Sequence, residues 1–206
     1  MLLGHTCDGA GSRIAAAGNS MTAIWFKIPW LIFLVIWCVG ALRTKPIVRR
    51  DPLGNRLLYS IPTLIGFYLL FTPQHSGPLS GRLLPSTPAF AWLGWGLTVL
   101  GLGLAIWARV HLGGNWSGAV TIKVGHELIR TGPYRRVRHP IYTGVLLASL
   151  GALFAIGERS CLVGMMLLIS ALLWKIHLEE RNMDTLFGPD YADYRRRSAA
   201  LLPGVY

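Results

Sequence analysis

Residues 140–174 read PIYTGVLLASLGALFAIGERSCLVGMMLLISALLW, two apolar runs that are separated only by Glu158 and Arg159. A helix needs about 20 apolar residues to cross the hydrocarbon core of a bilayer, and about 17 suffice at the low end. The first run, residues 140–157, meets that requirement. The second, residues 160–174, meets it if its helix continues for one more turn, to Leu178. We therefore predict a tight hairpin of two transmembrane helices.

Three further apolar runs precede this hairpin, at residues 22–41, 57–72 and 88–108. The composition agrees with them, because 52% of the 206 residues are hydrophobic and only 14% are charged. An ordinary soluble domain has about 25% charged residues, and a chain this apolar has too much surface to bury to remain disordered. The sequence therefore predicts an all-α, polytopic integral membrane protein with five transmembrane helices.

The positive charges predict how these helices are oriented. The segments 43–56 and 111–139 and the tail from Lys175 onward hold five Lys or Arg residues each, whereas the three other segments hold one each. Basic residues accumulate on the cytoplasmic side of membrane proteins, so we expect the N-terminus outside and the C-terminus in the cytoplasm, in a bacterial-type cytoplasmic membrane. The net charge of +11 is spread over three loops, as contacts with anionic lipid headgroups would be. This distribution excludes a nucleic-acid partner.

The remaining features predict regions rather than sites. Residues 1–20 are rich in Gly, Ala and Ser without a helical period, so we expect a mobile leader. Residues 21–85 would hold the first two transmembrane helices and their loops. The three cysteines are scattered without CxxC spacing, so neither a disulfide framework nor a metal site is expected. Gly101 and Gly103 lie inside the third apolar run and follow no strand, which favours close helix packing.

Residues able to do chemistry gather in two segments that the charge pattern assigns to the cytoplasm. In the first, residues 125–144, Gly132-Pro133 is typical of a turn. Pro140 suits the first turn of the fourth helix, where no backbone donor is lost. Tyr134, His139 and Tyr142 can therefore converge at the N-terminus of that helix.

The second segment, residues 174–194, begins at the inner end of the fifth helix. Lys175 and Glu179 lie one turn apart on one helix face. Ionisable side chains at such depth usually line a cavity or a pathway. The plainer interpretation is a helix ion pair that contributes about 0.2–0.5 kcal/mol. Tyr191 and Tyr194 by themselves fit an interfacial aromatic belt.

Together these segments resemble a known family. The run GHELIRTGPYRRVRHPIYTG, residues 125–144, followed by Glu179-Glu180, Phe187-Gly188, Tyr191 and Tyr194, is similar to the isoprenylcysteine carboxyl methyltransferase (ICMT) family. That family is related to the integral-membrane phospholipid methyltransferases. The resemblance covers roughly residues 90–206, so residues 86–206 would form the methyltransferase core. It implies an S-adenosylmethionine-dependent enzyme whose cofactor pocket opens to the cytoplasm and whose lipophilic acceptor enters from the bilayer.

The resemblance also implies which residues form the site. The cofactor-binding candidates are His126, Glu127, Leu128, Ile129, Tyr134, His139, Pro140, Ile141, Tyr142 and Glu179. The catalytic candidates are Lys175, Glu179, Glu180 and Arg138. In the isoprenylcysteine enzymes an Arg associated with the acceptor lies one turn before the carboxylate pair, and here that position is Lys175. Lysine keeps the charge but lacks the planar fork that binds a carboxylate through two bonds.

The residue chemistry leaves several assignments open. A cofactor with a carboxylate, an amino group, a ribose and an adenine needs a cation, a carboxylate and an aromatic ring. The candidates are, in that order, Arg138 or Lys175, Glu179 or Glu180, and Tyr134 or Tyr142. A carboxylate or thiolate acceptor needs no base, whereas a phospholipid amine or a small thiol would need one, for which His139 or Glu180 is the candidate.

Two other classes of protein compete with the methyltransferase. Membrane sterol and steroid reductases carry a similar Arg-His-Pro-x-Tyr segment and use NADPH. The 2′-phosphate of NADPH needs basic residues around it, whereas the adjacent carboxylates Glu179-Glu180 favour a methyl donor with an amino group. A non-catalytic membrane scaffold would not explain why polar residues gather in two segments.

Overall fold

The computed structural model describes residues 26–42, 44–72 and 77–203, so the expected leader, residues 1–20, lies outside the described residues. Helices dominate this part of the chain. The elements in chain order are a helix at Phe26–Ala41, β1 (Ile47–Arg50), α2 (Leu53–Phe71), the short 3-10 turn η1 (Gly77–Leu79), α3 (Pro88–Leu112), η2 (Gly113–Asn115), β2 (Thr121–Lys123), η3 (Gly132–Arg135), α4 (Pro140–Ile156), α5 (Arg159–Phe187) and α6 (Pro189–Arg197).

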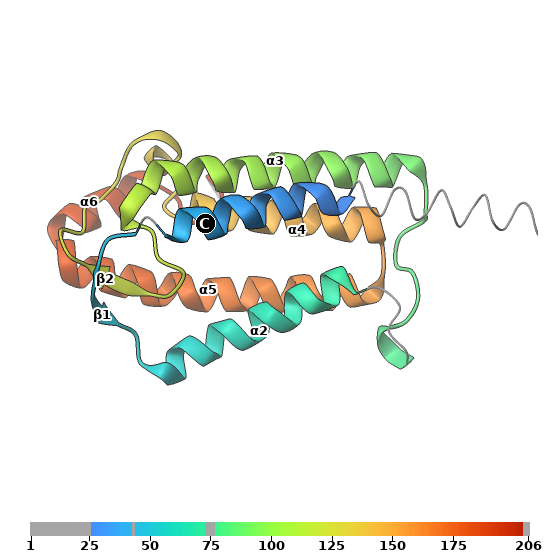
Figure 1. Ribbon diagram of the computed structural model, residues 1–206, viewed down its shortest axis with the longest axis horizontal. Coiled ribbons are helices and arrows are strands. Elements are labelled where there is room, and N and C mark those ends of the chain that lie inside the picture. Colours follow the sequence, from blue (N-terminus) through green and yellow to red (C-terminus); the bar gives the residue numbers. More distant parts are fainter. Residues whose placement is uncertain (1–25, 43, 73–76, 204–206) are drawn as a thin grey trace, which may run out of the picture.

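Each of the five apolar runs overlaps a helix, and the helices lie side by side, with α2 oblique to the others (Figure 1). By length and composition, residues 88–115 and 159–187 are sufficient to cross a membrane, while Phe26–Ala41 and α4 are shorter apolar helices. The predicted hairpin is present: α4 ends at Gly157, whose φ of 70° is left-handed, and α5 begins at Arg159. Glycine adopts this conformation without the steric cost that other residues incur.

The third and fourth helices pack against each other through glycines. A Cβ built on Gly101 of α3 would lie 2.5 Å from the backbone oxygen of Gly144 in α4, and one on Gly94 would lie 2.5 Å from the backbone oxygen of Gly151. Backbones this close leave room only for hydrogen at these positions. The packing prediction is therefore confirmed for Gly101, but it is wrong for Gly103, where a Cβ would meet nothing within 4 Å.

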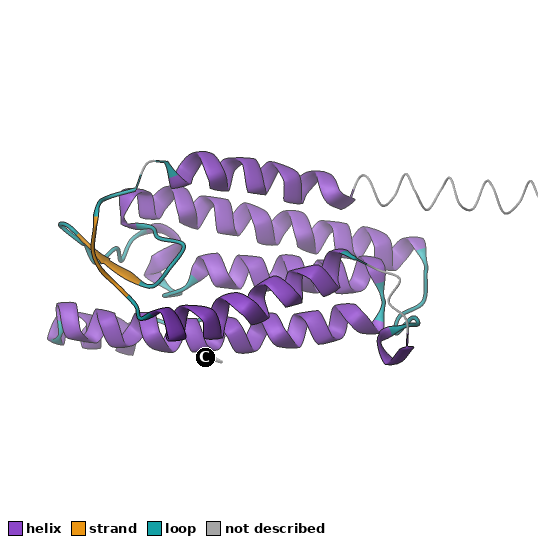
Figure 2. Ribbon diagram, turned by 60° about the horizontal axis from the view of Figure 1, so that its bottom comes forward, coloured by secondary structure: helices purple, strands orange, loops and turns teal. Residues whose placement is uncertain are grey.

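A two-stranded ribbon is the departure from the all-α prediction. β1 and β2 pair antiparallel, with Ile47 opposite Lys123 and Arg50 opposite Thr121 (Figure 2). Backbone groups of both loops need hydrogen-bond partners, and the ribbon supplies them. Strands of four and three residues carry too few positions to give an alternating pattern, so the sequence alone did not reveal them.

The ribbon gathers the basic segments at one end of the bundle. It joins segment 43–56 to segment 111–139, and α6 lies at the same end (Figure 1). At the opposite end the backbone N–H of Arg159 donates to Gly81 at 3.1 Å, and that of Leu83 donates to Gly157 at 2.6 Å. The fifth helix extends to Phe187, well past the expected end near Leu178, so one helix carries both the apolar run and Glu179-Glu180.

Candidate active site

A cavity of about 350 Å³ opens at the ribbon end, between the helices and the loops. Its polar residues come mainly from residues 115–142 and from the C-terminal half of α5. Its apolar residues come from the helix Phe26–Ala41, α2, α4, α5 and residues 112–129. The principal lining residues are Phe33, Trp37, Phe67, Asn115, Trp116, His126, Glu127, Tyr134, Tyr142, Val145, Leu172, Lys175, Glu179, Tyr191 and Tyr194.

The two segments singled out in the sequence meet at this cavity. The hydroxyl of Tyr142, in the first turn of α4, donates a hydrogen bond to Glu179 Oε1 of α5 at 2.6 Å. Both side chains line the cavity. A hydrogen bond to a charged acceptor is roughly twice as strong as a neutral one, so this contact fixes the distance between the two helices at the cavity wall.

His139 lies between the two adjacent carboxylates. Its Nδ1 is 3.4 Å from Glu179 Oε2 and its Nε2 is 3.3 Å from Glu180 Oε1. The imidazole stacks on the Tyr142 ring, with centroids 5.5 Å apart and planes at 7°. Burial by itself lowers the pKa of His139, but the hydrogen bonds that its ring donates to Glu179 and Glu180 outweigh burial, so the pKa lies above its ordinary value.

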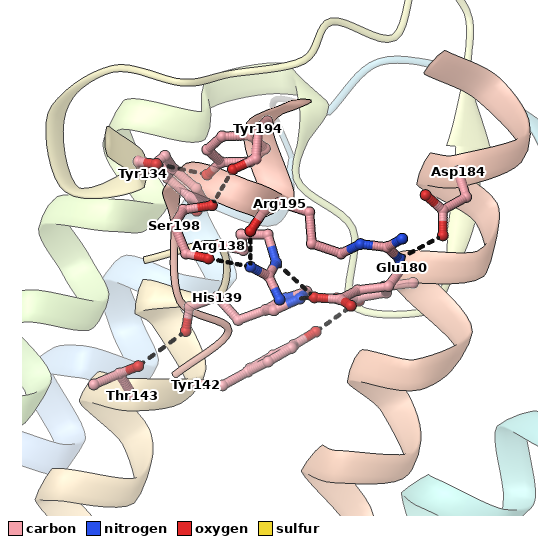
Figure 3. Close-up of polar contacts among 11 residues, drawn as sticks. Tyr134, Arg138, His139, Tyr142, Thr143, Glu180, Asp184, Tyr194, Arg195 and Ser198 are labelled. Carbon is pink, nitrogen blue, oxygen red and sulfur yellow. Dashed lines mark hydrogen bonds and ion pairs between the residues drawn. The ribbon is translucent and has the colours of Figure 1, made fainter. Parts of the chain in front are cut away.

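Arg138 ties this cluster to the end of the chain. Its Nε is 2.7 Å from Glu180 Oε1, and its Nη1 donates to the backbone oxygens of Ser198 and Arg195 (Figure 3). The backbone N–H of His139 donates to Ala200 at 3.0 Å. The guanidinium therefore uses several of its donors inside the protein, although Arg138 also lines the cavity.

Two tyrosines of α6 belong to the cavity rather than to a belt alone. Tyr191 and Tyr194 are buried and line it, and the Tyr194 hydroxyl donates to the backbone oxygen of Tyr134 at 2.5 Å (Figure 3). Burial raises the pKa of Tyr194 to about 12, which keeps the hydroxyl protonated as a donor. Tyr134 in turn donates to the backbone oxygen of Ala108 at 3.3 Å, so α6 is held against α3 through these rings.

The loop before η3 supplies polar atoms that have room for a ligand. His126 Nδ1 and Asn115 Oδ1 are buried and find no hydrogen-bond partner among the described residues. Burial lowers the pKa of His126, and the nearby Lys45 and Lys123 lower it further, so its imidazole is neutral. Glu127 is more exposed; its Oε2 accepts from Asn115 at 3.2 Å and lies 3.4 Å from Lys45. Buried polar atoms without partners are rare in folded proteins.

Lys175 projects along the cavity wall. Its Nζ donates to the backbone oxygen of Gly118 at 2.8 Å and lies 5.3 Å from the ring centroids of both Tyr59 and Tyr142. Ammonium groups at such positions are attracted to the ring faces. The amine is thus directed across to the loop. The ion pairs of Glu179 among the described residues involve His139 instead of Lys175.

The remaining candidates occupy different places. Leu128, Ile129 and Ile141 line the cavity, while Pro140 is buried as the first residue of α4. Glu180 reaches the cluster through His139 and Arg138. Within the described ranges no group of three or more His, Cys, Asp or Glu side chains is arranged to hold a metal ion.

Sequence reasoning missed the apolar part of the cavity. Phe33 and Trp37 of the helix Phe26–Ala41 line it beside Phe67 of α2. The spacing of Phe33 and Trp37, i and i+4, is a signal that could have placed both rings on one helix face. Tyr59 and Asn115 carry no such signal, because their roles depend on partners more than ten residues away in the chain.

Comparisons with known proteins agree with the motifs. Residues 94–185 match the profile of the isoprenylcysteine carboxyl methyltransferase (ICMT) family. The cobalt-zinc-cadmium resistance protein CzcN of Cupriavidus metallidurans is 32% identical over 113 residues, which are 52% of this chain and 48% of that protein. The protein-S-isoprenylcysteine O-methyltransferase of Schizosaccharomyces pombe is 33% identical over 115 residues, 52% of this chain and 47% of that enzyme.

The chain thus spans about half the length of these curated relatives. Among solved structures, that of the eukaryotic intramembrane Ras methyltransferase ICMT aligns with a TM-score of 0.49 and 21% identity, over 77% of this chain and 55% of that one. The matched region contains residues 115–142 and Glu179 of α5, which together form most of the polar cavity wall. Residues 94–185 therefore match the isoprenylcysteine carboxyl methyltransferase family, as their motifs indicated.

Proposed function

We propose that this protein is an S-adenosylmethionine-dependent integral membrane methyltransferase. It transfers a methyl group to a lipophilic acceptor, of the isoprenylcysteine carboxylate type, at the cytoplasmic boundary of the membrane. The observation that carries the proposal is a single cavity with both a polar and an apolar part: Tyr142 and Glu179 lie in the polar part, and Phe33, Trp37 and Phe67 lie in the apolar part. A polar cofactor and a lipophilic acceptor can bind next to each other in such a cavity.

The polar part has the donor set that this cofactor needs. Glu179 would hold the amino group or the ribose, with Tyr142 fixing its carboxylate at 2.6 Å. His126 Nδ1 and Asn115 Oδ1 are buried polar atoms that a ligand can satisfy. Ligand pockets of about 300–1,000 Å³ accept molecules of this size, and this cavity measures about 350 Å³. The other cofactor candidates of residues 126–129 and 139–142 surround the same space.

The chemistry requires little more than positioning. When bound, S-adenosylmethionine supplies an electrophilic methyl group on a cationic sulfur. Methyl transfer from it is an in-line displacement, so the protein contributes orientation and electrostatics. Glu179 supplies a negative charge at the cavity wall, and Lys175, one turn before it on α5, supplies a positive charge at the same wall.

The acceptor would lie along the apolar part of the cavity. Phe33 and Trp37 come from the helix Phe26–Ala41, and Thr63 and Phe67 from α2, so these two helices form the wall that would face lipid. Lys175 lies where the polar and apolar parts meet, and its charge would attract an anionic head of the acceptor. Lysine attracts as a point charge, without the two-bond geometry of arginine.

We further propose five membrane crossings, with the N-terminus outside, the C-terminus in the cytoplasm, and residues 86–206 as the catalytic core. Segments 43–56 and 111–139 are joined by the ribbon, and the α5 side chain of Lys175 bonds to Gly118. All three basic segments are thus at one end of the bundle. Gly81 and Arg159 meet at the other end. This arrangement supports one cytoplasmic face that holds the cavity.

Titration calorimetry on the purified full chain in lipid nanodiscs tests the function. We expect S-adenosylmethionine to bind and NADPH not to bind. Membranes that contain the protein, supplied with radiolabelled methyl donor, should then yield a labelled lipophilic product that membranes without it lack. Binding of NADPH alone would favour a reductase, and binding of neither would favour a scaffold. A labelled phospholipid amine or small thiol would replace the acceptor class proposed above.

A further inference from the structure

We propose that His139 is held as an imidazolium between Glu179 and Glu180 and acts as a positioning residue for Glu179, not as a general base. The inference rests on the proposed function for its effect on methyl-donor binding. The protonation state that it assigns does not depend on that function.

The geometry of the two ring nitrogens carries the argument. Nδ1 lies 3.4 Å from Glu179 Oε2, and Nε2 lies 3.3 Å from Glu180 Oε1. A neutral imidazole has one N–H and one lone pair, whereas an ionised carboxylate only accepts. A neutral His139 would therefore direct a lone pair at one of the two carboxylates. His139, Glu179 and Glu180 together must therefore hold one proton more than a neutral imidazole and two ionised carboxylates would hold.

The neighbouring donors decide where that proton resides. Glu179 Oε1 already accepts from the Tyr142 hydroxyl at 2.6 Å, and Glu180 Oε1 accepts from Arg138 Nε at 2.7 Å. Hydrogen bonds to the charged form of a carboxyl group favour that form. Both carboxylates are thus stabilised as anions, and the proton belongs on the imidazole.

The charges around the ring agree. From α5, Glu179 and Glu180 face it, and Lys175 lies near by, over the Tyr142 ring. From its own loop Arg138 shares Glu180, and from α4 the Tyr142 ring stacks on it. From α6, Tyr191 and Tyr194 lie near Glu180 as neutral phenols. With the imidazolium present, Arg138 and His139 balance the two carboxylates within a largely buried cluster, where an unbalanced charge would be costly.

This arrangement has two consequences. The imidazolium fixes the second oxygen of Glu179, so that the carboxylate is held from both sides at the cavity wall. While it is protonated, His139 cannot accept a proton from an amine or thiol acceptor. The same contacts raise the pKa of His139. The contact of the His139 imidazolium with both carboxylates is therefore fully present below the ordinary pKa of histidine, and it is lost as the pH rises through the raised pKa of His139.

Nuclear magnetic resonance on the full chain with ¹⁵N-labelled histidine, in nanodiscs, tests the protonation state. We expect both ring nitrogens of His139 to be protonated near neutral pH and to lose a proton only above the ordinary pKa of histidine. The His139→Gln variant assigns the resonance; should it fail to fold, replacing the other histidines one at a time assigns it by elimination. A single neutral tautomer near neutral pH would overturn the proposal.

Methyl-donor binding gives the functional readout. We expect His139→Gln to bind S-adenosylmethionine about tenfold more weakly at neutral pH, because a charge-assisted contact to Glu179 is lost. The amino group of the methyl donor also titrates near neutral pH, but this affects binding to the wild-type protein and to His139→Gln equally. The ratio of the two dissociation constants should therefore fall toward one as the pH passes the His139 pKa.

Equal affinity of the two proteins at all pH values would overturn the positioning role. A failure of the wild-type protein to bind the donor would overturn the proposed function instead, and it would leave the resonance measurement as a valid test of the imidazolium. His177→Gln, on the same helix as Glu179 but outside the cluster, is the matched control and should leave donor affinity unchanged.

Discussion

The two sides of α4 are held in opposite ways. Toward α3, backbones touch: a Cβ on Gly144 would lie 2.7 Å from the backbone nitrogen of Ala105. Toward α5, at the ribbon end, side chains hold the helices apart, through Tyr142 and Glu179 and through His139 and Glu180. One contact depends on the absence of side chains, and the other depends on polar side chains and their charges.

This difference separates scaffold from site. The glycine contact leaves no space between α3 and α4, so it can position α4 but cannot admit a ligand. The polar contact leaves a cavity of about 350 Å³. Steric changes should therefore disrupt the α3–α4 contact, and isosteric charge changes should disrupt the α4–α5 contact at the cavity. Each kind of change should have little effect on the other contact.

The largest effect is expected from Gly101→Ala. Its Cβ would lie 2.5 Å from the backbone nitrogen of Ala148 and 2.5 Å from the backbone oxygen of Gly144, and backbone atoms cannot move aside cheaply. Overpacking of this kind costs about 1–3 kcal/mol, occasionally more, so we expect a loss of about 3 kcal/mol in the free energy of unfolding. Denaturant titration in detergent, followed by tryptophan fluorescence, measures it.

Gly103→Ala, two residues along α3, is the matched control. A Cβ there would meet nothing within 4 Å, and replacing a helical glycine with alanine stabilises by about 0.4–1 kcal/mol. The two variants should thus shift stability in opposite directions. Equal effects would show that close approach to α4 is not what requires Gly101.

The next largest effect is expected from Glu179→Gln. The amide keeps the size of the side chain but loses the charge that faces His139 and the cavity. Removing a charged hydrogen-bond partner costs about 1.5–3 kcal/mol, so methyl-donor affinity should fall by about tenfold to one hundredfold. Calorimetry measures the affinity, and membrane insertion should be unaffected. Unchanged affinity would remove Glu179 from the site.

The contrast between the two sides also explains what the sequence could predict. Residues 140–157 and 88–108 are apolar throughout, so the helices α4 and α3 could be placed from hydropathy alone. The pairing of Tyr142 with Glu179 could be anticipated only as a convergence of two segments, because their 2.6 Å contact joins residues 37 positions apart.

Other parts were not predictable for definite reasons. The end of α5 was expected near Leu178 because the apolar run stops there, but Glu, Arg, Met and Leu, which favour helices, make up most of residues 179–187 and continue α5 to Phe187. The ribbon depends on pairing between Ile47 and Lys123, which no local pattern encodes. Tyr191 and Tyr194 resemble belt residues in sequence, and only the packing of α6 brings them to the cavity.

A smaller effect is expected from Lys175→Ala, at the boundary between the polar and apolar parts. Its ammonium bonds to Gly118 and lies over the rings of Tyr59 and Tyr142. We expect kcat/KM for the methyl acceptor to fall about tenfold, as a single long-range charge contact is lost. Donor affinity should stay within about twofold. Steady-state kinetics with the acceptor identified by methyl labelling separates the effect on acceptor turnover from the effect on donor affinity.

Lys175→Arg tests whether charge or shape matters at this position. Arginine restores the positive charge and adds a planar fork, so it should recover most of the acceptor turnover lost in the alanine variant. If the alanine variant instead weakens donor binding and spares acceptor turnover, Lys175 belongs with Glu179 in the cofactor part of the cavity.

The smallest effect is expected from Glu127→Gln, at the exposed rim of the same cavity. Hydrogen bonds from Asn115 and Lys45 lower the pKa of Glu127, so the side chain is ionised at neutral pH. Glu179, which accepts from Tyr142 and faces His139, is ionised as well. Its surroundings differ, because the Glu127 side chain is 67% exposed and that of Glu179 is 23% exposed. Water screens exposed charges, and exposed ion pairs contribute little. Donor affinity should therefore change by no more than about threefold. A loss as large as that of Glu179→Gln would mean that the loop, rather than α5, supplies the negative charge that the methyl donor needs.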